Sequence, residues 1–104
     1  MTLRVAVDAT ELASGAPGGV RKALWLLLAS LARHAPGVEA VACSPTPLLP
    51  PEGVRLLVTG GPARPLLWRR SRALRRALPS FDLFHSPVTA VPLLPGPPRT
   101  ATVH

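Results

Sequence analysis

A glycine-rich stretch near the N-terminus constrains the fold of this chain more than any other feature. It reads Ser14-Gly15-Ala16-Pro17-Gly18-Gly19-Val20-Arg21-Lys22. The residues before it, 3–7, are typical of a buried strand, and those after it, 20–34, are typical of a buried helix that ends before Pro36-Gly37. A strand, a glycine-rich loop and a helix in this order leave backbone N–H groups unpaired at the helix start. Such groups favour an anion such as phosphate.

The same loop has a simpler interpretation, which stays open at this point. Gly18 and Gly19 lack a Cβ atom, so that a ligand can approach the backbone closely. In the alternative, the loop is a plain turn between strand and helix, and the glycines only relieve steric strain. A glycine-rich loop on its own does not separate these two interpretations. A dehydrogenase-type dinucleotide site is excluded, because the G-x-G-x-x-G spacing is missing.

The rest of the chain alternates apolar segments with proline- and glycine-rich connections. Strands are expected at residues 38–42, 54–58 and 81–85 and from 99 onward, and a second helix at 65–78. Four prolines within 44–53 and four within 92–98 exclude regular structure in those connections. This order predicts an α/β domain with a Rossmann-like, mostly parallel sheet and flanking helices.

Polar residues follow several of these strands. The glycine-rich loop comes after the first strand, His85-Ser86 after the fourth, and His104 at the fifth. Since ligands of open parallel sheets collect at the carboxyl ends of the strands, we expect these residues to share one cleft. An alternative for His85 is a histidine at the core edge that bonds to the backbone. For Asp8 we favour a structural role, in which its carboxylate bonds loop N–H groups.

Charge and cysteine content limit the class of protein. The single cysteine, Cys43, lies in an apolar run and is expected to be a buried, inert thiol in a reducing cytoplasm. The longest apolar run is about half of what a membrane span requires. Residues 61–104 hold seven arginines against Asp82 alone, which points to an anionic partner.

The arginines concentrate in the expected helix 65–78, where Arg69, Arg72 and Arg76 lie away from the apolar face. They are our candidates for contact with an anionic surface. Three interpretations stay open: a solvated helix face, docking on anionic lipid with Trp68 and Leu66 inserted, and nucleic-acid binding. Nucleic acid is the least favoured, because the helix has no helix-turn-helix partner and the chain has no tyrosine and only two phenylalanines for stacking.

Four stretches together resemble the N-terminal half of a known enzyme family. They are Arg4-Val5-Ala6-Val7-Asp8-Ala9-Thr10-Glu11-Leu12, Pro17-Gly18-Gly19-Val20, Phe81-Asp82-Leu83-Phe84-His85-Ser86-Pro87 and Thr102-Val103-His104. In order and rough spacing they are similar to retaining glycosyltransferases of family 4, which have the GT-B fold and include many bacterial mannosyltransferases. The resemblance extends over nearly the whole chain.

The resemblance implies a hexosyltransferase that moves a sugar from a nucleotide-sugar donor to a glycan or a lipid-linked acceptor. It implies that His104 approaches the transferred sugar, that Gly18 and Gly19 contact the donor diphosphate or the acceptor, and that His85 and Ser86 line the acceptor side. Neither a metal nor a cofactor is expected, and positive groups would stabilise the leaving phosphate. Peripheral contact with the inner face of the cytoplasmic membrane suits a lipid-linked acceptor.

The resemblance has two departures. Arg21 and Lys22 stand where the family usually has a further glycine and often a tyrosine. The donor-binding C-terminal domain, with its Glu–seven residues–Glu motif, is absent from residues 1–104. We therefore expect a partial, acceptor-side domain with no transferase activity of its own. The alternative function is a stand-alone basic α/β module that binds an acidic lipid surface or nucleic acid through the arginine-rich helix.

Overall fold

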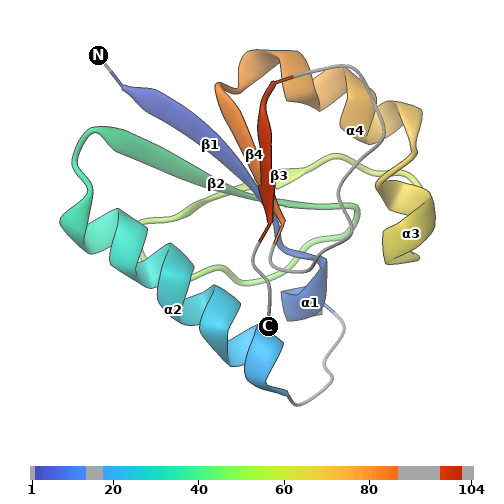
Figure 1. The fold of residues 1–104 in the computed structure, drawn as a ribbon. Helices are drawn as coiled ribbons and strands as arrows, with labels where there is room; N and C mark the ends of the chain where they lie inside the picture. Colours follow the sequence, from blue (N-terminus) through green and yellow to red (C-terminus); the bar gives the residue numbers. More distant parts are fainter. Residues whose placement is uncertain (1, 14–17, 87–96, 102–104) are drawn as a thin grey trace.

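The computed structural model describes residues 2–13, 18–86 and 97–101. They form a five-stranded sheet in the order β3-β2-β1-β4-β5, and all neighbouring strands are parallel (Figure 1). The strands are β1 (Leu3–Asp8), β2 (Val38–Ser44), β3 (Arg55–Val58), β4 (Leu83–Ser86) and β5 (Arg99–Ala101). This is the predicted Rossmann-like α/β architecture.

Helices cover both faces of the sheet. After β1 comes a short helix, α1 (Thr10–Ala13), and then α2 (Gly19–His34), which lies on one face; α3 (Pro65–Trp68) and α4 (Arg72–Ala77) lie on the other (Figure 1). A 3₁₀ turn, Leu78–Ser80, follows α4 and leads to β4. No helix in the described part of the chain is long and apolar enough to cross a bilayer.

The core under α2 is built from valine, alanine and leucine side chains. Val5 and Val7 of β1 point to this face and pack with Leu24 and Leu28, the two buried leucines of α2. Alternate strand residues share a face of the sheet, so Ala6 points to the other side. The sequence interpretation of residues 3–7 and 20–34 is confirmed, with each element extended by one residue.

The core under α3 and α4 contains larger side chains. Its buried members are Ala6, Val41, Cys43, Trp68, Leu74, Leu78, Phe81 and Phe84. Burial raises the pKa of the Cys43 thiol to about 12, which leaves it protonated and inert at neutral pH. The expectation of a buried, unreactive cysteine is thereby confirmed.

The predicted helix 65–78 is wrong in one respect, because the chain forms two helices there. The break lies at Ser71, whose Oγ accepts a hydrogen bond from the Leu74 N–H (3.2 Å) and donates one to the Trp68 carbonyl (2.7 Å). Serine competes with the backbone in this way, which ends one helix and caps the next. Ahead of α3, Gly61 has φ +92°, a conformation that other residues rarely adopt.

Candidate functional site

The start of α2 is open at its glycines. Gly18 is the N-cap residue with φ 167°, which is extended backbone that any residue adopts. A Cβ atom added to Gly18 or Gly19 would meet no described atom within 4 Å. The described atoms therefore give no steric reason for glycine at these two positions, and the plain-turn interpretation and the anion-site interpretation of the loop both stay open.

A cavity of about 450 Å³ lies against this helix start. The described residues that line it are Leu12, Gly18, Arg21, Lys22, Trp25 and Leu26. The first N–H groups of a helix have no acceptor within the helix, and the positive end of the helix dipole lies beside them. With Arg21 and Lys22 next to these groups and Trp25 and Leu26 one turn further on, the cavity suits an anionic group attached to an apolar body.

A buried polar cluster at the carboxyl end of β1 was not predicted in full. The Asp8 carboxylate accepts hydrogen bonds from the Thr10 backbone N–H (3.0 Å) and from the Thr10 hydroxyl (2.7 Å). Its second oxygen accepts one from Arg69 Nε at 2.6 Å, and Arg69 Nη2 reaches the Thr10 hydroxyl at 3.4 Å. The expected structural role of Asp8 is confirmed, and its partner Arg69 lies 61 positions further along the sequence.

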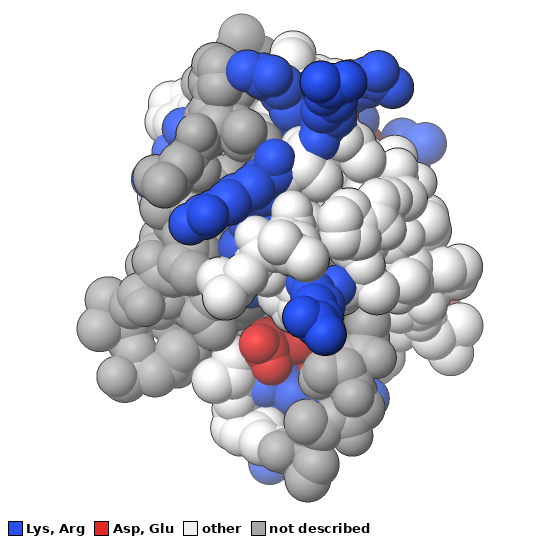
Figure 2. Space-filling model, turned by 90° about the vertical axis from the view of Figure 1, so that its right-hand side faces the viewer, with Lys and Arg blue, Asp and Glu red and all other residues white. Residues whose placement is uncertain are grey.

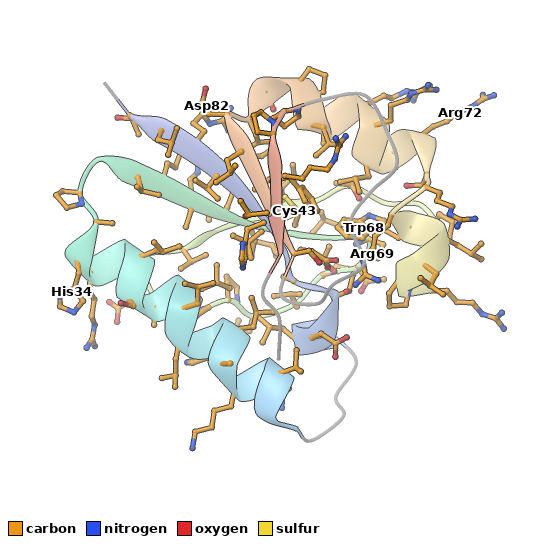
Figure 3. The ribbon with its side chains drawn as sticks, in the orientation of Figure 1. His34, Cys43, Trp68, Arg69, Arg72 and Asp82 are labelled. Atoms are coloured by element: carbon orange, nitrogen blue, oxygen red, sulfur yellow. The ribbon has the colours of Figure 1, made fainter. Side chains whose placement is uncertain are left out.

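Arg69 is therefore not a surface contact, and that assignment is corrected. Its side chain is buried, and Figure 3 shows it between α3 and the sheet, while Arg72 extends away from the molecule. The helix break at Ser71 turns Arg69 toward β1, where the buried carboxylate of Asp8 requires a cation. Arg72 and Arg76 lie exposed on α4, in agreement with their assignment to a surface.

Trp68 does not lie at the surface, where the lipid interpretation requires it. It is 0% exposed, and its indole N–H donates to the Thr59 hydroxyl at 2.7 Å. A side chain held in this way cannot insert into a lipid surface, so this part of the lipid interpretation is wrong. The neighbouring Leu66 and Leu67 are the exposed apolar residues of α3.

His85 and Ser86 point to opposite faces of the sheet. His85 faces the α2 side and lines an apolar cavity of about 200 Å³ with Val5, Val7, Leu27, Leu31, Val38 and Leu83. Its Nδ1 lies 2.7 Å from the Thr100 hydroxyl of β5, and burial lowers the pKa of the ring. Ser86 is fully buried on the other face.

The described residues therefore do not form the single cleft that the sequence indicated. The residues that line the cavity at the start of α2 do not include His85 or Ser86. The third member of the expected cleft, His104, lies outside the described residues. Within the described ranges, no group of three or more histidine, cysteine, aspartate or glutamate side chains is placed to hold a metal ion.

Known proteins offer no match to this chain. No family model matches it, and neither a curated protein nor a solved structure does. The function is therefore inferred from the residues of the chain and their geometry.

Proposed function

We propose that this chain is the N-terminal, acceptor-side portion of a retaining glycosyltransferase of family 4 type. The whole enzyme would transfer a sugar from a nucleotide-sugar to a glycan or a lipid-linked acceptor in the cytoplasm. The four stretches of sequence resemblance support this proposal, and the Rossmann-like parallel sheet is the architecture that they imply. The observation that carries it is the open helix start at Gly18 and Gly19, beside a cavity with two basic side chains.

In this proposal the start of α2 binds an anionic group of the substrate. Backbone N–H groups and the helix dipole hold the anion, and Arg21 and Lys22 add two charges at the rim of the cavity. Trp25, which is 40% exposed, and Leu26, which is 57% exposed, offer apolar contact area for the rest of the ligand.

The remaining roles come from the resemblance alone. His104 would approach the transferred sugar, and His85 and Ser86 would contribute to the acceptor side once the second domain is present. The donor domain would supply the groups that stabilise the leaving diphosphate, so no metal is invoked.

Alanine substitutions at the two glycines test the anion site without disturbing the fold. We expect Gly18→Ala/Gly19→Ala to fold as the parent chain does, because the added Cβ atoms meet no described atom. In a titration with a short-chain phosphatidic acid followed by backbone amide chemical shifts, the parent should respond at residues 18–22. The double variant should bind about tenfold more weakly, since the added methyl groups block hydrogen bonds to a charged ligand.

Gly37→Ala is the matched control, because this glycine also has open space at its Cβ position and lies at the far end of α2. It should bind the phosphatidic acid as the parent does. The absence of shift changes at residues 18–22, or equal affinity of the parent and the double variant measured at those residues, would contradict the anion site.

A further inference from the structure

Five exposed arginines gather on the α3–α4 side of the molecule. They are Arg64, Arg70, Arg72, Arg75 and Arg76, named here the arginine surface. No acidic residue occurs in the sequence between Glu52 and Asp82. Elsewhere, Asp8 pairs with Arg69, and Glu39 pairs with Arg4 and Arg55. Figure 2 shows several groups of basic side chains on this side of the molecule and an acidic side chain beside one of them.

Two large apolar side chains interrupt this charged surface. Leu66 is 67% exposed and Leu67 is 53% exposed, and both lie in α3 between Arg64 and Arg70. Trp68 of the same helix belongs to the buried core, whereas Leu66 and Leu67 do not. An exposed apolar pair with flanking cations is the composition of a surface that meets anionic headgroups and the acyl boundary together.

We propose that the arginine surface, with Leu66 and Leu67, docks on a bilayer that contains anionic lipid. The guanidinium groups bind headgroup phosphates, and the two leucines enter the interface between headgroups and acyl chains. Nucleic acid fits this surface less well, because both phenylalanines and Trp68 are buried and Trp25 lies on α2, across the sheet. No described aromatic ring on this side can therefore stack on a base.

The buried ion pair ties this surface to the carboxyl edge of the sheet. Arg69 follows α3 directly and is bonded to Asp8, the last residue of β1, and to Thr10, the first of α1. Arg69 therefore joins the end of α3 to the carboxyl edge of the sheet. The inference does not rest on the proposed transferase function, since it uses exposed residues on the other side of the sheet from α2.

Vesicle binding by the 104-residue chain tests the proposal. Sedimentation with large unilamellar vesicles should show binding to a mixture of phosphatidylcholine and phosphatidylglycerol and little binding to phosphatidylcholine alone. Arg72→Gln/Arg75→Gln/Arg76→Gln should lower the partition coefficient about a hundredfold, because each arginine near an anionic surface contributes about fivefold. Leu66→Ser/Leu67→Ser should lower it more than about tenfold, since two partly inserted leucines are lost.

Matched variants distinguish binding through this surface from effects of overall charge and hydrophobicity. Arg33→Gln removes one exposed charge from α2 and should change binding less than about twofold, whereas Arg76→Gln should lower it about fivefold. Leu49→Ser, at a loop leucine that is 85% exposed, should leave binding unchanged. Circular dichroism should show that the variants at these exposed positions keep the fold.

Three results would overturn the proposal. They are equal binding to neutral and anionic vesicles, an equal loss in each variant and its matched control, and binding to a single-stranded oligonucleotide that exceeds vesicle binding and is unaffected by Leu66→Ser/Leu67→Ser. The last result would instead favour nucleic acid as the partner. None of these results changes what is expected of the Gly18→Ala/Gly19→Ala variant at residues 18–22. Failure of lipid docking and failure of the anion site are therefore distinguishable.

Discussion

The two faces of the sheet are covered in different ways. On one face a single helix of 16 residues, α2, packs two leucines onto small valines and alanines. On the other face two helices of four and six residues contribute Trp68 and Leu74 to a core that also contains Phe81 and Phe84. The long helix is stabilised by its own backbone ladder and an apolar stripe, whereas helices this short gain little from either.

The short helices depend instead on individual side-chain contacts. Ser71 caps α4, the Trp68 indole bonds Thr59, and Arg69 pairs with Asp8. The difference teaches that the α3–α4 face is held by a few specific contacts and the α2 face by repeated apolar ones. It follows that single substitutions should have larger effects on the α3–α4 face.

The two tryptophans test this difference with one type of substitution. Trp68→Ala should lower the free energy of unfolding by about 3–5 kcal/mol, because it empties a fully buried site. Trp25→Ala, at a residue that is 40% exposed on α2, should cost about 1 kcal/mol or less. Urea denaturation followed by circular dichroism measures both values. Equal losses would contradict the burial of Trp68 on the α3–α4 face.

The buried and exposed ion pairs make the second comparison. Arg69→Ala leaves the Asp8 carboxylate buried without a cation and should lower the free energy of unfolding by about 3–5 kcal/mol. Arg55→Ala, at an arginine that is 74% exposed and paired with Glu39, should lower it by about 0.2–1 kcal/mol.

The double variant Asp8→Asn/Arg69→Met provides the internal control. It should recover part of the stability that Arg69→Ala loses, because no unpaired charge is then left in the interior. Losses that simply add across the two sites would argue against direct coupling between Asp8 and Arg69.

The smallest expected effect concerns the pH dependence at His85, on the α2 side. Burial lowers the pKa of His85 below its ordinary value of 6.5 in the folded chain. The unfolded chain therefore binds more protons than the folded chain between 6.5 and the lowered pKa, and stability falls as the pH drops through that window. His85→Gln should flatten this part of the profile, measured as urea midpoints from about pH 7.5 to about pH 5.5. An unchanged slope would contradict the assignment.

The regular spacing of apolar residues explains which parts of the fold were predictable. The strand at residues 3–7 and the helix at 20–34 carry regular apolar patterns, and both occur as expected. The helix at 65–78 also has such a pattern, but Ser71 interrupts it by bonding to the backbone. The short helix α1 was missed, because four residues are too few to show a period.

The candidate site, like the fold, was predictable only in part. The glycine-rich loop and the surface positions of Arg72 and Arg76 followed from sequence. The pairing of Arg69 with Asp8 did not, because the two residues lie 61 positions apart. One signal was available: an aspartate at the end of a buried strand requires a cation, and the arginine-rich segment is the obvious source.

The sequence by itself determined the order of the five strands, the glycines at positions 18 and 19, and the excess of arginine in one segment. These properties are local, since they follow from residue type and short-range periodicity. Only the tertiary structure decided which arginine is buried, that Trp68 belongs to the core, and that His85 and Ser86 face opposite sides of the sheet. The reason is that burial and pairing depend on which distant segments pack together. Here β1 pairs with β2 and β4, and its last residue, Asp8, pairs with Arg69, which follows α3.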